Sequence, residues 1–264
     1  MGYQHVSEIM ATGSQMRSLR AGDRVFSATF PGHVEFHVLR DHDLHVKLHA
    51  DDPAEAMALL GVAGVAVHNV RRAGVRSTDR VLVIGAGLIG QCCAQAAAAT
   101  GASVVVTDRH ADRLQLAQAL SKAASVDANR EDGWTRVADR GPYDVVLECS
   151  GALELSRLIA PGGASLFGRR SRPRLVLVAG RETVQYPFVP AGGVELTVLH
   201  TQHFDQADLD AALEMHRAGT LKLAPLVRDV VPVSDAPEIY SRLRDEPASL
   251  LGTIFTFDQS WRTP

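Results

Sequence analysis

Three glycines spaced as G-x-G-x-x-G, namely Gly85, Gly87 and Gly90, follow a short apolar run. A strand that turns tightly into a helix presents backbone N–H groups and a positive dipole end, which together bind a pyrophosphate. Each glycine has a separate role at this spacing. Gly85 permits the sharp turn, Gly87 the close approach of the phosphates and Gly90 the close packing of the helix on the sheet. The pattern therefore predicts a dinucleotide phosphate site, with Leu88 and Ile89 opening the helix.

An acidic residue ends the next apolar run. Asp108 lies 18 residues after Gly90, close to the spacing at which a carboxylate accepts hydrogen bonds from both hydroxyls of an adenosine ribose. Because a carboxylate there repels a 2′-phosphate, Asp108 favours NAD(H) over NADP(H). Arg109 and Arg113 are further candidates for this subsite, and Arg109 keeps NADP(H) open because an arginine can pair with a 2′-phosphate.

Apolar runs and helical stretches alternate from Asp79 to about Leu221. The runs are continuous, which is typical of parallel strands buried on both faces. With right-handed crossovers they predict an α/β fold, a doubly wound parallel sheet of the Rossmann type. The expected strands are 81–84, 104–106, 145–147, 175–178 and 196–199, and the expected helices are 88–100, 111–120, 134–140 and 208–218.

The two flanks of this region differ from it. Residues 1–50 are short β-like pieces broken by glycine and proline, and residues 222–264 follow the pattern strand, helix, strand. We expect both flanks to form one small lobe, with the dinucleotide-binding domain, residues 51–221, inserted between them. A chain of 264 residues has room for two such domains.

Composition excludes several classes of protein. The net charge of −3 argues against a nucleic-acid partner, which would require a clustered basic face. The N-terminus lacks the basic and apolar regions of a secretory signal, and no apolar stretch reaches the ~18 residues that span a bilayer. Three cysteines make no disulfide framework. We expect a cytoplasmic protein with reduced thiols and no membrane partner.

The order of motifs resembles the medium-chain dehydrogenase/reductase superfamily, which includes the alcohol and sorbitol dehydrogenases. The matching segments are G-D-R-V at residues 22–25, H-N-V-R-R-A-G at 68–74 ahead of the glycine motif, and D-V-V-L-E-C-S-G at 144–151. The resemblance implies a nicotinamide cofactor and a small GroES-like β lobe beside the Rossmann domain. It also implies further cofactor contacts from Cys149, Ser150, Val178, Ala179 and Gly180.

The departures from the family pattern concern zinc. Where the family has G-H-E the chain has Gly2, Tyr3 and Gln4, and Gly61 stands where polyol dehydrogenases have a glutamate. A catalytic zinc needs about three protein ligands, so we expect no zinc. We expect the four-cysteine zinc loop to be missing. We also expect the lobe to be incomplete, because about 50–60 residues of its N-terminal part, judged from the usual size of such a lobe, are missing. The combination resembles zinc-free members such as the bacteriochlorophyllide-type and quinone-type reductases.

Without zinc, another group must stabilise the developing oxyanion or deliver a proton. Tyr3 and His5 are candidates because they lie in the stretch that carries zinc ligands in relatives. His68, on the crossover helix, is the third, although a core or interface histidine is the favoured interpretation. Five histidines at 33, 37, 42, 45 and 49 suggest a metal site, but a polar loop with solvated histidines is the favoured interpretation.

These features lead to two hypotheses. The first is an NAD(H)-dependent oxidoreductase that moves a hydride to or from a carbonyl, alcohol, enone or quinone without zinc. The second is a non-catalytic NAD(H)-binding remnant or accessory subunit that lacks part of the substrate cleft. In either case the segment Glu195–His200 is apolar enough to be a liability as a bare sheet edge, and we expect a homodimer through it.

Overall fold

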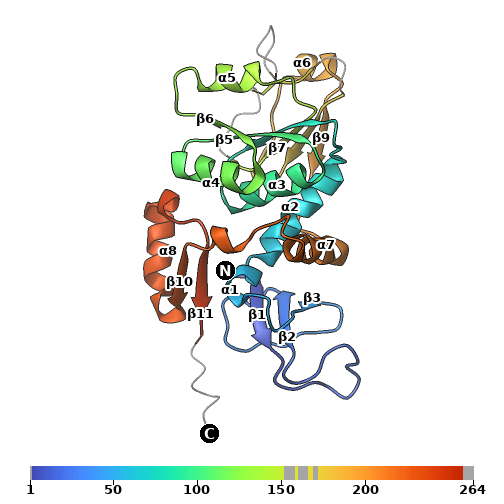
Figure 1. Cartoon of the computed structure of the whole chain (residues 1–264), viewed down its shortest axis with the longest axis vertical. Helices are drawn as coiled ribbons and strands as arrows, with labels where there is room; N and C mark the ends of the chain where they lie inside the picture. Colours follow the sequence, from blue (N-terminus) through green and yellow to red (C-terminus); the bar gives the residue numbers. More distant parts are fainter. Residues whose placement is uncertain (1, 152–157, 160–165, 169–171, 258–264) are drawn as a thin grey trace. The chain divides into compact units, whose positions relative to one another are not determined.

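The computed structural model describes residues 2–151, 158–159, 166–168 and 172–257. The chain divides into two compact units, shown in Figure 1. Unit 1 contains residues 1–64, 205–216 and 222–264, and unit 2 contains residues 65–204 and 217–221. None of the helices in the described part of the chain combines the length and apolarity that crossing a bilayer requires.

Unit 2 is built on a six-stranded sheet in the order β6-β5-β4-β7-β8-β9. All five strand pairings are parallel. The order reverses direction between β4 and β7, so the first strand in sequence lies in the middle, as in a doubly wound nucleotide-binding sheet. The strands are β4 (Arg80–Ile84), β5 (Ser103–Asp108), β6 (Ala124–Asp127), β7 (Val145–Glu148), β8 (Arg174–Leu177) and β9 (Thr197–His200).

The central strands are buried along nearly their whole length, which explains their continuous apolar sequences. Every residue of β7 is buried, and only Arg80 of β4 is exposed. Helices α3 and α4 pack against β4, β5 and β6, as Figure 1 shows. The predicted parallel sheet is therefore confirmed. Among the described residues, the helices that lie wholly in this unit are α3 (Leu88–Ala99), α4 (Ala111–Ser121), α5 (Gly133–Asp139) and α6 (Phe188–Gly193).

Two elements of unit 2 are absent from the sequence prediction. Strand β6 lies at one edge of the sheet and buries fully only Val126, so it has no continuous apolar run. Helix α6 has six residues and includes a proline and two glycines, which are poor helix formers. Strand β9 forms the opposite edge of the sheet.

Unit 1 combines the two flanks of the chain. Three antiparallel strands, in the order β1-β2-β3, form one sheet, and β10 and β11 form a separate parallel pair. These elements are β1 (Gln4–Glu8), β2 (Arg24–Ala28), β3 (Leu44–Lys47), α1 (Ala54–Met57), α7 (Gln206–Arg217), β10 (Asp229–Pro232), α8 (Ala236–Asp245) and β11 (Thr253–Thr256).

The first unit boundary lies after residue 64 and not after the expected residue 50, and residues 205–216 belong to unit 1, whereas the boundary after residue 221 is the expected one. The first falls within α2 (Leu60–Ala73), because the Gln4 carboxamide accepts a hydrogen bond from the Val62 N–H (3.2 Å). The core of α7 belongs to unit 1 because Gln206 pairs with the backbone of His45 in both directions, at 3.3 and 2.9 Å. Both contacts are made by polar side chains, so the pattern of hydrophobic residues does not predict them.

Candidate functional site

The glycine-rich turn follows β4 at the point where the strand order reverses. Gly85 has a φ of +93°, and a Cβ there would lie 3.1 Å from the Ser150 backbone nitrogen. A Cβ at Gly90 would lie 1.8 Å from the Gly85 carbonyl oxygen, so only glycine lets α3 pack against the turn. By contrast, a Cβ on Gly87 would meet no atom within 4 Å. The turn is tight on its inner side and open at Gly87, which fits a pyrophosphate.

The start of α3 faces this open space. Gly87 is the N-cap residue, and Gln91 donates its backbone N–H to the Gly87 carbonyl at 2.8 Å. The amides of the first helical turn, which include Leu88 and Ile89, have no intrahelical acceptor. The helix dipole adds positive potential at the same end.

The Asp108 carboxylate links the end of β5 to the glycine turn. Its Oδ2 accepts a hydrogen bond from the Ala86 N–H at 2.6 Å. Its Oδ1 accepts two from His110, one from the backbone N–H at 2.9 Å and one from the ring Nδ1 at 2.7 Å. Burial raises the pKa of Asp108, but these hydrogen bonds outweigh burial and hold the pKa below its usual 3.8. Asp108 is therefore ionised at neutral pH and fixed against the turn.

The two arginines predicted at this subsite differ in position. Arg109 is exposed, and its carbonyl oxygen accepts a hydrogen bond from the Asn129 carboxamide at 2.7 Å. Arg113 is half-buried on α4, and its carbonyl oxygen accepts one from the Gln91 carboxamide at 2.8 Å. Gln91 thereby ties α4 to α3, which keeps Asp108 and the glycine turn in register.

The remaining predicted cofactor contacts surround Glu148, which the sequence analysis did not select. The fully buried Glu148 carboxylate accepts hydrogen bonds from the Ser150 N–H (2.9 Å) and hydroxyl (2.5 Å). It also pairs with the Arg181 guanidinium. The Glu148 carbonyl accepts the N–H groups of Val178 and Ala179, both at 3.1 Å. Glu148 thus ties together the segments after β7 and β8, the latter ending at Gly180.

Cys149 lies between Glu148 and Ser150, and its position is structural. Its N–H donates to the Ile84 carbonyl at 2.9 Å, and its sulfur lies 4.0 Å from that of Cys93. Burial raises the pKa of the neighbouring Cys92 thiol to about 12. The Cys93 thiol has its pKa raised first by its hydrogen bond with Cys149 and then by burial. These two thiols on α3 are therefore protonated at neutral pH.

Two of the three predicted catalytic residues, Tyr3 and His5, belong to unit 1. Tyr3 stacks on Phe30 with ring centroids 5.6 Å apart. Burial raises the pKa of the Tyr3 phenol above its usual 10, against a smaller lowering effect of its hydrogen bond with Gln4. The ring Nε2 of the buried His5 lies 2.7 Å from the Gly32 carbonyl oxygen. His68 belongs to unit 2, where its Nδ1 lies 3.5 Å from the Arg71 guanidinium.

The two positions at which the family resemblance implies zinc ligands, Gln4 and Gly61, meet in unit 1. A Cβ on Gly61 would lie 2.7 Å from the Oε1 of Gln4, and that same oxygen binds the Val62 N–H. A neutral carboxamide occupies this space. It offers neither the imidazole nor the carboxylate that zinc takes from proteins, so these residues do not fit a catalytic zinc.

The five histidines of the first flank make separate local contacts. The His33 ring meets the edge of Phe255 at a centroid distance of 4.9 Å, and the His37 Nε2 lies 3.2 Å from the Ser27 hydroxyl. The His45 Nδ1 donates to the Asp43 carbonyl at 2.8 Å. His42 and His49 are exposed.

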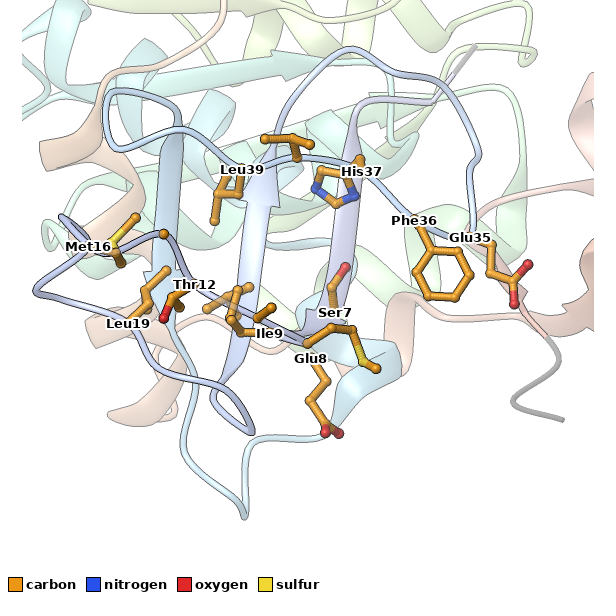
Figure 2. A pocket seen from close by; sticks show the side chains of 15 residues that line it. Ser7, Glu8, Ile9, Thr12, Met16, Leu19, Glu35, Phe36, His37 and Leu39 are labelled. Carbon is orange, nitrogen blue, oxygen red and sulfur yellow. The ribbon is translucent and has the colours of Figure 1, made fainter. Parts of the chain in front are cut away.

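Unit 1 also contains a cavity of about 350 Å³ that the sequence analysis did not anticipate. In Figure 2, Glu35 and Phe36 line one side of it and Met16 and Leu19 the opposite side. None of the predicted catalytic residues is among the side chains that line it.

The chain is similar in sequence to known dehydrogenases and reductases. The model of a family described as zinc-binding dehydrogenase matches residues 89–168. A probable D-xylulose reductase A from Aspergillus clavatus is 26% identical over 92% of the chain and 77% of its own length. A 2-dehydro-3-deoxy-L-galactonate 5-dehydrogenase from Pseudoalteromonas atlantica is 28% identical over 79% of the chain, which spans 60% of that relative.

Solved structures share the fold. An alcohol dehydrogenase from Thermus sp. ATN1 superposes with a TM-score of 0.81 at 20% identity, covering 98% of this chain and 84% of its own. An Escherichia coli alcohol dehydrogenase in complex with NADH superposes with a TM-score of 0.80 at 17% identity, covering 96% of this chain and 82% of its own.

Proposed function

We propose that this chain is a member of the medium-chain dehydrogenase/reductase superfamily, to whose members it is similar in sequence and fold, and that it is an NAD(H)-dependent oxidoreductase that works without zinc. Its substrate would be a small molecule with a carbonyl, an alcohol, an enone or a quinone group. The observation that carries the proposal is the Asp108 carboxylate, ionised at the end of β5 and held against the glycine turn by the Ala86 N–H. An acid in this place selects an adenosine ribose with free hydroxyls.

In this proposal, each part of the cofactor has its own part of the site. The open turn at Gly87 and the first amides of α3 would hold the pyrophosphate, and Asp108 would hold the adenosine ribose. The backbone of Val178 to Gly180, fixed by Glu148, would hold the nicotinamide carboxamide. When bound, the nicotinamide supplies the acceptor or donor of the hydride.

The protein's own residues must then stabilise the oxyanion and handle the proton. The Tyr3 phenol has its pKa raised by burial, so it stays protonated and suits a proton donor better than a base. His5 and His68 are the other candidates. An enone or quinone spreads the developing charge by conjugation, so reduction of such a substrate demands less of these residues than alcohol oxidation does.

The zinc-free part of the proposal rests on Gln4 and Gly61. The family resemblance implies a zinc ligand at each of these two positions. The Gln4 amide lies in the space that a side chain at position 61 would occupy. The same observation favours a second candidate, a protein that binds NAD(H) without turnover. Strand β9 is an edge strand, and we include in the proposal a homodimer formed through residues 195–200.

The test is a calorimetric titration with NADH and NADPH, followed by a turnover screen. We expect the wild-type chain to bind NADH more tightly than NADPH. The Asp108→Asn variant should lose roughly tenfold or more in NADH affinity, since charge-assisted hydrogen bonds are lost. Asp112→Asn, the same charge change at the exposed start of α4, is the matched control and should bind like wild type.

The screen measures NADH oxidation with a ketose, an enone and a quinone. Turnover of one class supports the oxidoreductase, and binding without turnover of any class supports the non-catalytic alternative. A chain that binds neither cofactor refutes both candidate functions.

A further inference from the structure

We propose that His110 determines cofactor selectivity in this site: its ring competes with the adenosine ribose for Asp108, so that the preference for NADH over NADPH increases with pH. The inference rests on the proposed function, since it concerns the ribose subsite of the same cofactor. It adds His110 to the residues of the ribose subsite, although neither the glycine motif nor the position of Asp108 in the sequence marks His110 as part of that subsite.

The hydrogen-bond capacity of Asp108 carries the argument. A carboxylate has about four acceptor positions, two on each oxygen. The Oδ1 already receives the backbone N–H and the ring Nδ1 of His110, and Oδ2 receives the Ala86 N–H. One position remains, whereas a ribose diol that binds through both hydroxyls requires two.

The ring is the partner that can leave. The Ala86 and His110 amides belong to the backbone of the turn and of the residue before α4, and Leu114 anchors that residue by donating to its carbonyl at 3.1 Å. The His110 side chain is 33% exposed and makes no side-chain cap for α4. Rotation about its own side-chain bonds would free one position on Oδ1.

The protonation state of His110 sets the strength of this competition. Because a carboxylate only accepts hydrogen bonds, the ring Nδ1 must carry a proton in this contact. With both ring nitrogens protonated, the contact becomes an ion pair, which is stronger than a neutral hydrogen bond. A protonated ring therefore keeps the diol away from Asp108 and also cancels the charge that repels a 2′-phosphate.

The charged groups considered around His110 are those of its own segment, of α4 and of the neighbouring strand β6. Asp108 and Arg109 lie on its own segment, Asp112 and Arg113 on α4, and Asp127 ends β6 next to Asp108 in the sheet register. Of these, Asp108 is the group paired with the ring. The direction of the effect follows: low pH favours the paired ring and weakens NADH relative to NADPH, whereas high pH leaves only the weaker neutral hydrogen bond, which the ribose can displace.

The experiment measures dissociation constants for NADH and NADPH by calorimetry between about pH 5.5 and 8.5, where histidines change charge. For wild type we expect the ratio of NADPH to NADH dissociation constants to rise about tenfold across this range, the factor that a charge-assisted hydrogen bond is worth. For His110→Gln the ratio should vary only through the ionisation of the 2′-phosphate itself, and NADH should bind more tightly than to wild type at the acidic end of the range.

His42→Gln is the matched control. His42 is an exposed histidine of unit 1 whose Nε2 lies 4.0 Å from an Asp43 oxygen, and this variant should behave like wild type. Circular dichroism checks that each variant is folded. If wild type binds NADH but His110→Gln keeps the wild-type pH dependence, the inference is wrong and the proposed function stands. If no chain binds NADH at any pH, both fail.

Discussion

The carboxamide oxygen of Gln4 lies 2.7 Å from the point that a Cβ on Gly61 would occupy. Where the family resemblance implies two zinc ligands, the chain has a glycine and a neutral amide that lies in the space beside it. The two residues fit each other, because the absence of a side chain at Gly61 leaves room for the carboxamide of Gln4.

This contact predicts the metal content of the protein. Purified wild-type chain should contain far less than one zinc per molecule by elemental analysis, and a chelator should not change its NADH affinity. The variant Tyr3→His/Gln4→Glu/Gly61→Glu introduces an imidazole and two carboxylates and should retain more zinc after dialysis. One zinc per wild-type chain, removed by chelator with loss of binding, would contradict the zinc-free proposal.

The glycine turn predicts that one alanine substitution mainly lowers stability and another mainly lowers NADH affinity. Gly90→Ala places a methyl group 1.8 Å from the Gly85 carbonyl oxygen and should lower the free energy of unfolding by roughly 2–4 kcal/mol. Gly87→Ala meets open space and should cost about 1 kcal/mol at most, as expected at an N-cap, yet it should weaken NADH binding. Denaturant unfolding and calorimetry measure the two effects, and equal loss of stability in both variants would refute the assignment.

The buried pair of Glu148 and Arg181 predicts a large effect of removing one charge. Glu148→Gln leaves the mostly buried guanidinium without its counter-charge and should lower the free energy of unfolding by about 3 kcal/mol. Adding Arg181→Met should recover part of that loss, because no buried charge then remains.

The control for this pair is Asp132→Asn. Asp132 pairs with Arg130 at 2.9 Å on the surface, where an ion pair contributes little, so this variant should show no measurable loss. A double variant less stable than Glu148→Gln would show that the pair does not act through its charges.

The pKa of Asp108 predicts a pH dependence of stability. Its folded-state pKa lies below the usual 3.8, so its contribution is complete above pH 3.8 and is lost as the pH falls through the folded pKa. The free energy of unfolding should therefore decrease on acidification below about pH 4, and Asp108→Asn should flatten this decrease. Asp112→Asn provides the comparison, and an unchanged slope in the Asp108 variant would contradict the assigned hydrogen bonds.

The sequence was sufficient for features that depend on local geometry. The turn at Gly85 and the parallel strands β4, β5, β7 and β8 follow from residue type and hydrophobic pattern, and the structure confirms them. At the start of α7, Asp208 donates its N–H to the Asp205 carboxylate at 2.9 Å, a local contact between residues three positions apart.

The features that the sequence did not predict depend on side chains that meet across distant segments. Arg181 reaches Glu148 over 33 residues, and no periodic pattern marks either as a partner. The role of His110 depends on the rotation of one ring. Strand β6 was missed because its single fully buried residue, Val126, leaves no pattern to detect.

Glu148 holds Ser150 through its side chain and Val178 and Ala179 through its carbonyl. Two loops at neighbouring strand ends are therefore preorganised by one residue before any cofactor arrives. The conformational entropy of ordering these loops is lost during folding, so the binding step does not have to supply it. The ribose end of the site differs, because there a ring must move before both hydroxyls can bind.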